Sequence, residues 1–296
     1  MIISFGFEAN SFFALAIRSF TTVSYTHLLP TLIAFAIAFL VPFLMGIYLS
    51  FCKFTTVTNA KWVGIANYTR AFSNRDFPSA LWFTVKFTVV SVILINILAF
   101  LLALLLTRKV KGTNVFRTIF FMPNLIGGIV LGYIWQLIIN SVLLATVGAD
   151  ITSRAGYGFW GLVVLMCWQM IGYMMIIYIA GIQNVAPELI EAAQIDGATG
   201  WQVLTKVTIP MVMPSVTICL FLTISNSFKL FDQNLSLTAG LPGKQTQMMA
   251  LDIFNTFYGR NGWEGVGQAK AVIFFVIVGI ITFTQLWLTR RKEVEG

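Results

Sequence analysis

Residues 187–214 read PELIEAAQIDGATGWQVLTKVTIPMVMP, the most polar block in a strongly apolar chain. The block nevertheless carries helix signals. Pro187 suits the first position of a helix, and acidic residues in the turn that follows are favoured by the helix dipole. Ala192 and Ala193 form helices well and have small side chains, so another protein can approach the backbone closely. Gly197 is placed to end this first helix.

A second short helix is expected directly after this glycine. Thr199 and Gln202 have the spacing of a capping box, in which each side chain bonds the backbone of the other residue. This helix should end before Pro210, because the residue before a proline disfavours the helical conformation. The stretch therefore predicts a helix–glycine–helix elbow, placed between two membrane segments.

The composition of the whole chain defines its class. Hydrophobic residues make up 58% of the sequence, charged residues 10%, and the mean hydropathy is +0.85. Several segments reach the roughly 20 apolar residues that a helix needs to cross a bilayer. We expect an all-α polytopic membrane protein with six transmembrane helices, over residues 28–51, 81–106, 118–139, 159–182, 211–231 and 269–288.

The charges and the cysteines argue against two other classes of protein. The net charge of +8 does not indicate a nucleic-acid partner, because the cations gather at the ends of the apolar segments. Cys52, Cys167 and Cys219 lie in apolar surroundings without metal-ligand spacing. They are expected to be small buried side chains, with no disulfide and no metal site.

The cations also predict the orientation of the chain. Arg108, Lys109, Lys111 and Arg117 lie in one short loop, and a second basic run closes the chain, which is typical of cytoplasmic segments. Both termini should then be cytoplasmic. Residues 1–26 contain no apolar run long enough to cross the bilayer, and they could form an interfacial helix.

Part of the polar block resembles a known motif. Glu191-Ala192-Ala193, then Gly197, then Val207-Thr208-Ile209-Pro210 is similar to the EAA loop of the permease subunits of ABC importers. In that family the elbow is the coupling helix, which docks on a cytoplasmic ATPase. The resemblance implies the type I importer permease fold and assigns ATPase coupling to Glu188, Glu191, Ala192, Ala193, Asp196, Gly197 and Pro210.

A wider likeness covers roughly residues 60–292 and points to the carbohydrate permeases of the binding-protein-dependent family, in particular their MalF-like subunit. It rests on Leu237-Thr238-Ala239-Gly240-Leu241-Pro242 and on the terminal run Arg291-Lys292-Glu293-Val294-Glu295.

The partners that this resemblance implies are a second permease subunit, two ATPase subunits that carry ATP and Mg, and an extracytoplasmic solute-binding protein. The protein would be an integral part of a prokaryotic cell membrane. Its expected divisions are residues 1–80 (N-terminal segment, first span and external connection), 81–288 (permease core with the coupling loop) and 289–296 (cytoplasmic tail).

No energy source is encoded in the sequence. The only Gly-Lys pair, Gly243-Lys244, is followed by Gln245, and Thr238 takes the place of the first glycine of a P-loop. Catalytic sets of carboxylates or of nucleophile and base are also missing. The chain is thus predicted to be a translocation pathway and not an enzyme, with no cofactor of its own.

Polar side chains inside apolar spans indicate where a substrate could bind, because burying them in lipid is costly. Hydroxyl and amide groups beside aromatic rings suit a sugar. Interhelical hydrogen bonding without any ligand remains the alternative for each of these residues. The residues expected at a mid-membrane sugar site, several by resemblance alone, are Asn124, Gly128, Gln169, Tyr173, Thr223, Asn226, Ser227 and Leu230.

Two alternatives stay open on the sequence. Lys229 could pair with an anionic solute, such as glycerol phosphate or an uronate oligosaccharide, or it could extend to the lipid headgroups. A secondary transporter driven by an ion gradient would instead need internal repeats and ionisable residues at mid-membrane. The sequence shows neither feature, so the ATP-driven carbohydrate importer is the leading hypothesis.

Overall fold

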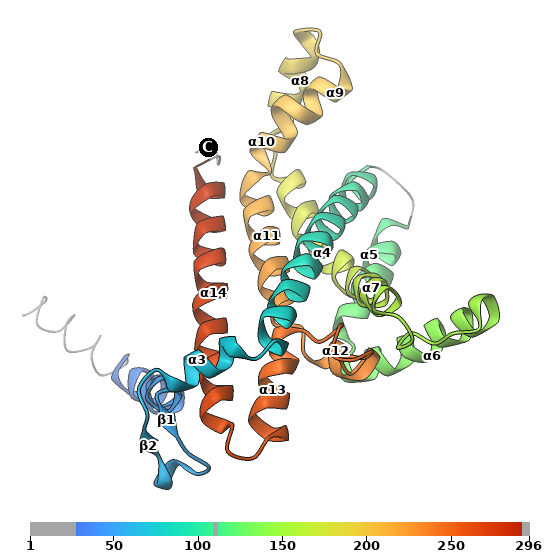
Figure 1. Ribbon diagram of the computed structural model, residues 1–296. Helices are drawn as coiled ribbons and strands as arrows, with labels where there is room; N and C mark the ends of the chain where they lie inside the picture. Colours follow the sequence, from blue (N-terminus) through green and yellow to red (C-terminus); the bar gives the residue numbers. More distant parts are fainter. Residues whose placement is uncertain (1–27, 109–111, 292–296) are drawn as a thin grey trace, which may run out of the picture.

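The computed structural model describes residues 28–108 and 112–291, which are almost entirely helical (Figure 1). The predictions made for residues 1–26, for Lys109 and Lys111 and for the last five residues lie outside this part of the chain. The elements, in chain order, are η1 (Ala36–Leu40), α2 (Val41–Ser50), β1 (Cys52–Lys53), η2 (Val57–Asn59), β2 (Lys61–Trp62), α3 (Ala66–Ser73), α4 (Asp76–Leu106), α5 (Thr113–Phe121), η3 (Met122–Leu125), α6 (Gly128–Val147), α7 (Ala155–Gln183), α8 (Pro187–Ile195), α9 (Gly200–Val203), η4 (Leu204–Thr208), α10 (Ile209–Met211), α11 (Met213–Phe228), α12 (Asp232–Leu237), α13 (Met249–Gly259) and α14 (Glu264–Arg290).

Five helices are long and apolar enough to cross a membrane: Leu28–Ser50, which includes η1 and α2, together with α4, α6, α7 and α14. A sixth candidate is the pair Gly200–Met211 and Met213–Phe228, whose two parts meet at an angle of 67°. The described residues thus offer five spans, or six when the bent pair is one span. The all-α polytopic prediction is confirmed.

The predicted third span, residues 118–139, is wrong in its boundaries. The chain there forms α5, the 3₁₀ turn η3 and then α6, which continues to Val147 through the first half of the predicted loop. Pro123 lies in η3 and has no backbone N–H to donate to a continuing helix. The break it causes leaves the side chain of Asn124 half-buried between two helices, where it lines a cavity.

Two other spans begin five residues earlier than predicted. Helix α4 starts at Asp76 and not at residue 81, because Pro78 lies in its first turn, where a backbone N–H has no helical partner in any case. Helix α14 starts at Glu264 and not at residue 269. In both cases a polar first turn precedes the apolar segment, so hydropathy alone places the start too late.

The core lies where α4, α7 and α11 pack together. Helix α7 is the most buried span, with 61% of its apolar window inside the protein, against 6% for α14. Phe87 of α4, Met174 of α7 and Cys219 of α11 are fully enclosed in this cluster. All three cysteines are buried, as the sequence predicted.

Glycines allow two close helix contacts beside this core. A methyl group at Gly132 would collide with Ser236 of α12, and one at Gly128 would meet Asp232 and Gln233. These two glycines therefore allow α6 to approach α12 closely.

The two ends of the helical bundle differ (Figure 1). The elbow, residues 187–211, projects from one end, where the C-terminal ends of α4 and α14 also lie. We call this the elbow end. The opposite end, here the far end, carries the paired strands β1 and β2 with α3, and the connection between α13 and α14.

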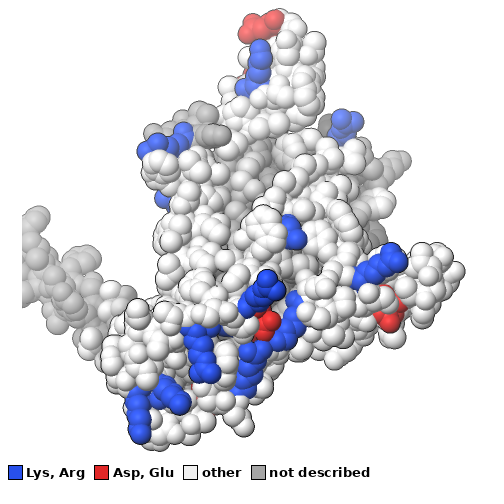
Figure 2. Space-filling model, viewed as in Figure 1, with Lys and Arg blue, Asp and Glu red and all other residues white. Residues whose placement is uncertain are grey.

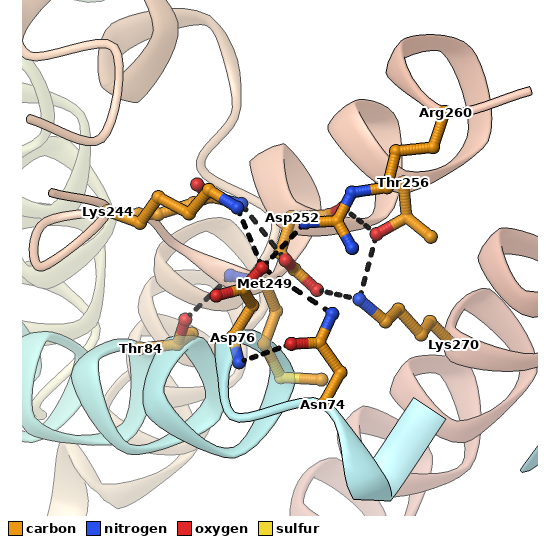
Figure 3. Close-up of polar contacts among 10 residues, drawn as sticks. Asn74, Asp76, Thr84, Lys244, Met249, Asp252, Thr256, Arg260 and Lys270 are labelled. Atoms are coloured by element: carbon orange, nitrogen blue, oxygen red, sulfur yellow. Dashed lines mark hydrogen bonds and ion pairs between the residues drawn. The ribbon is translucent and has the colours of Figure 1, made fainter. Parts of the chain in front are cut away.

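A polar network fixes the far end (Figure 3). The Asp76 carboxylate at the start of α4 accepts hydrogen bonds from Lys244 at 2.7 Å and from Arg260 at 2.8 Å. It therefore connects α4 to the segments that precede and follow α13. Deeper in the protein, Lys270 of α14 donates to Asp252 of α13 at 2.6 Å. Both side chains of this second pair are almost fully buried.

Candidate functional site

The elbow has the two helices that the sequence predicts. Helix α8 begins at Pro187, and Gly197 follows it with a φ of +80°, a left-handed conformation that favours glycine. The capping box is present: the Thr199 N–H donates to Gln202 Oε1 at 2.7 Å, and the Gln202 N–H donates to Thr199 Oγ1 at 3.4 Å. The turn between α8 and α9 is thus fixed by local hydrogen bonds.

The predicted end of the second helix before Pro210 is wrong. From α9 the chain passes through the π-helical turn η4 into α10, which contains Pro210, and it bends only at Val212. In η4 the Ile209 N–H donates to the carbonyl of Leu204, five residues back. This shift of the hydrogen-bond pattern accommodates a residue that lacks an N–H without ending the helix.

The surface of the elbow is unusual for a projecting segment. Glu188, Glu191 and Asp196 are exposed, together with the short side chain of Ala192. Ile195 is 85% exposed and Trp201 is 72% exposed. Large apolar side chains grouped on a projecting surface are typical of an interface with another protein. Neither residue was among the predicted coupling residues, although an Ile and a Trp inside a polar block can indicate an interface.

A polar cavity of about 310 Å³ lies where the break between α5 and α6 meets α7 and the junction of α11 with α12. It brings together five of the eight residues predicted at a substrate site: Asn124, Gln169, Tyr173, Asn226 and Leu230. Its other lining residues are Met166, Met170, Lys229, Phe231, Asp232 and Gln233.

The polar groups of this cavity are only partly used by the protein. Gln233 donates to Gln169 Oε1 at 2.7 Å, and Gln169 in turn donates to the Ile126 carbonyl at 3.4 Å. Within residues 28–108 and 112–291 the Tyr173 hydroxyl makes no hydrogen bond, while its ring meets Phe121 edge-on. The cavity therefore presents an unpaired hydroxyl and several amides beside aromatic and methionine side chains.

The other three predicted residues lie outside the cavity lining. Thr223 is fully buried, donates to the Cys219 carbonyl at 2.7 Å and accepts from Asn96 at 3.0 Å. Ser227 is fully buried and contacts the sulfur of Met166. Gly128 packs on α12, as described above. Their substrate contacts remain a prediction, while their hydrogen bonds and packing join helices.

Asp232 and Gln233 are polar lining residues that were not predicted at the substrate site. They follow α11 after a three-residue turn and begin α12, whose first residues face the α5–α6 break. A six-residue helix has too few turns to give a periodic signal. Only the polar run from residue 232 to residue 234 directly after a span could have indicated it.

The residues that the structure describes contain no group of three or more His, Cys, Asp or Glu side chains placed to hold a metal ion. The site consists of an exposed elbow at one end of the helical bundle and a polar cavity farther along it. Helices α7 and α11 connect the two, since each contributes to the cavity and leads directly into the elbow.

This arrangement is that of the transmembrane subunit of an importer, and comparison with known proteins agrees. Residues 111–294 match the family model described as binding-protein-dependent transport system inner membrane component. The chain belongs to this family.

Several curated relatives match over nearly the whole chain. The chain is 45% identical to the probable starch degradation products transport system permease protein AmyD of Thermoanaerobacterium thermosulfurigenes, over 90% of this chain and 93% of that protein. It is 30% identical to the trehalose/maltose transport system permease protein MalF of Thermococcus litoralis, over 90% and 92%. The family resemblance seen in the sequence is thus confirmed.

The fold is also found among solved structures. A chain of a bacterial ABC transporter involved in the import of the acidic polysaccharide alginate superimposes with a TM-score of 0.79, at 20% identity, over 94% of this chain and 98% of that chain. At this identity the likeness concerns the fold alone. It agrees with the predicted importer-permease architecture.

Proposed function

We propose that this protein is the translocation subunit of an ATP-driven importer that carries a sugar or oligosaccharide across a prokaryotic cell membrane. The elbow carries the proposal, because its exposed Ile195 and Trp201 beside three carboxylates need a partner surface. That partner would be an ATPase subunit holding ATP and Mg, one of two in the assembly. This chain would supply the pathway and the docking surface, and the ATPase would perform the hydrolysis.

A second permease subunit would complete the pathway. Only 6% of the apolar window of Leu28–Ser50, and only 6% of that of helix α14, is buried in this chain, so both helices keep apolar surface for lipid or another subunit. The cavity is also only partly enclosed by this chain and needs a further wall to surround a substrate. Both features support a heterodimer, as the family resemblance implies.

The far end would receive the external solute-binding protein. Cations gather over this end in Figure 2. Six exposed cations there have no ion-pair partner within the described ranges: Lys53, Lys61, Arg70, Arg75, Lys86 and Arg154. Such a surface favours a partner with an acidic rim, since complementary charge speeds association.

This assignment of ends places the elbow in the cytoplasm. Arg117 donates to the Leu106 carbonyl at the C-terminal end of α4, Lys206 belongs to η4 of the elbow, and Arg290 ends α14, so all three belong to the elbow end. Cytoplasmic segments are typically rich in such cations. The far end is also cationic, so charge counting alone would not orient the protein. The orientation therefore rests on the elbow as the ATPase docking site, and it puts the C-terminus inside.

The charges of the cavity favour a neutral solute over an anion. Lys229 lines it, as the alternative hypothesis of an anionic substrate requires, but Asp232 lines it too. The two charges cancel, and the remaining groups are amides, a hydroxyl and aromatic rings. Neutral donors and acceptors beside rings suit sugar hydroxyls and ring faces. The names of the curated relatives, which refer to starch products and to trehalose or maltose, support the same class.

The energy source can be tested directly in vesicles that contain the complete complex and its binding protein. Uptake of labelled sugar should require ATP inside the vesicles and should persist when an uncoupler removes the proton gradient. Loss of uptake on uncoupling, with ATP held constant, would favour a secondary transporter instead.

Two tyrosines of α7 allow a matched test of the cavity. Tyr173→Phe should change the relative uptake of different sugars, because the hydroxyl is free for a ligand. A hydrogen bond to a neutral ligand is worth about 0.5–1.5 kcal/mol, so a loss in apparent affinity of about 2- to 10-fold is expected. The melting temperature of the purified complex should stay unchanged.

Tyr178→Phe is the control, since the Tyr178 hydroxyl donates to Asn96 Oδ1 at 2.7 Å inside the core. This variant should melt at a lower temperature and keep the wild-type order of sugars. A stability loss in Tyr173→Phe with unaltered sugar preference would instead make Tyr173 a packing residue.

A further inference from the structure

An aromatic groove lies beside the polar cavity, between α13 and α14. Its volume is about 460 Å³, larger than the 310 Å³ of the polar cavity. Rings from Phe254, Phe257, Tyr258 and Phe274 line it. The function described above does not use this groove.

Three of its rings form a continuous ladder. The ring of Phe231 lies 5.1 Å from that of Phe254, which lies 5.0 Å from that of Tyr258, centroid to centroid. Tyr258, at the far end of α13, is 72% exposed, and Phe254 is 40% exposed. The ladder therefore runs from an open position at the far end toward the interior of the protein.

Phe231 joins the groove to the polar cavity, because its side chain lines both. It lies in the short turn between α11 and α12, directly before Asp232. A ligand that extends beyond the polar cavity past Phe231 would therefore enter the groove.

Two polar groups among the rings remain unpaired. Neither the Gln268 amide, which lines the groove, nor the Tyr258 hydroxyl makes a hydrogen bond to another residue in the described parts of the chain. A surface intended only for lipid tails would leave such groups without a partner, which is costly. Rings that offer their faces beside a few hydrogen-bonding groups match the two kinds of surface on a sugar.

We infer that the groove is a second sugar subsite, which holds the glycosyl units of an oligosaccharide that trail behind the unit in the polar cavity. The inference rests on the proposed function, since it presumes that a sugar enters from the far end. It predicts that uptake depends on the groove only for long sugars. A long oligosaccharide contacts both the cavity and the groove, whereas a disaccharide is held by the polar cavity alone.

The test compares uptake of short and long sugars by the reconstituted complex with its binding protein. Phe254→Leu keeps an apolar side chain of similar bulk but removes the ring face. Phe283→Leu is the matched control, because Phe283 is an exposed phenylalanine on α14 that lies outside the groove. The probes are gluco-, xylo- and arabino-oligosaccharides, each supplied with two units and with six units.

Uptake by the wild-type complex is measured first and shows which of these series is carried. An absence of uptake for every series would refute the proposed function itself. For a series that is carried, Phe254→Leu should lower kcat/KM for the six-unit sugar by about 2- to 10-fold, the worth of one aromatic contact. The two-unit sugar should change less than about 2-fold, and Phe283→Leu should match the wild type for both lengths.

Two results would overturn the subsite. An equal loss for both lengths, together with weaker co-purification of the second permease subunit, would show that the groove is a subunit interface. Unchanged uptake of both sugars in Phe254→Leu and in the double variant with Tyr258→Leu would show that the rings do not contact the substrate.

Discussion

Ile195→Asp should abolish ATP-driven uptake while leaving the fold of the chain intact. The side chain is 85% exposed and makes no core contact, so the substitution costs this chain almost nothing on its own. In the assembled importer the same side chain would be an apolar anchor in a pocket of the ATPase. Burying a carboxylate there removes a contact and adds an unpaired charge. Losses at such anchors are typically about 2–4 kcal/mol, which lowers affinity for the ATPase by roughly 30- to 1000-fold.

The measurement is co-purification of the ATPase subunits with the tagged permease, together with ATPase stimulation by the loaded binding protein. Val57→Asp is the matched control, because Val57 is also an exposed aliphatic residue but lies in η2 at the far end. The control should retain bound ATPase. Full ATPase binding and coupled uptake in Ile195→Asp would remove the elbow from the proposed interface.

Much of the elbow could be predicted because its geometry is set by local sequence. A proline at the first helical position, a glycine with φ of +80° and a capping box are all specified within a few residues. Such local rules need no knowledge of the rest of the fold. The passage through Pro210 could not be predicted, because the π turn that accommodates it depends on how the chain enters α11.

The cavity was only partly predictable, because long-range packing and not local sequence decides which side chains line it. The polar residues Asn124, Gln169 and Asn226 stand out against apolar spans, and all three line it. Thr223 and Ser227 stand out in the same way, yet their side chains point into the helix contacts. Which face of α11 meets the cavity is decided by packing against α4 and α7, which the sequence of α11 alone does not encode.

The buried ion pair between Asp252 and Lys270 at the far end was not predicted from the sequence. The predicted spans, residues 211–231 and 269–288, leave Asp252 in a loop and Lys270 at the start of the last span. The partners are 18 residues apart and meet only because α13 folds back along α14. No local rule pairs them.

Both members of the pair make further hydrogen bonds inside the protein (Figure 3). Lys270 Nζ donates to Asp252 Oδ2 at 2.6 Å and to Thr256 Oγ1 at 2.8 Å. The other carboxylate oxygen of Asp252 accepts from Gln247 at 3.0 Å. Lys270 also lies 5.4 Å from the ring centre of Phe77. Within the described residues this network connects the beginnings of α4, α13 and α14.

Asp252→Asn should therefore destabilise the complex more than any exposed charge change at the same end. The substitution keeps the shape of the side chain but leaves the Lys270 ammonium, which is 0% exposed, without a counter-charge. Breaking a buried pair in this way costs about 3–5 kcal/mol, because the remaining charge is neither solvated nor neutralised. The melting temperature of the purified complex in detergent reports the effect.

Asp76→Asn is the matched control, since Asp76 also forms ion pairs but remains partly exposed, with its two cations at 2.7 and 2.8 Å. Solvent screens such pairs, and each is worth about 1 kcal/mol or less. The double variant Asp252→Leu with Lys270→Met should melt above Asp252→Asn, because it removes both buried charges together. If Asp252→Asn and Asp76→Asn melted at the same temperature, the inner pair would be solvated in the assembled importer. The far end would then be open to water at a depth where this structure is closed.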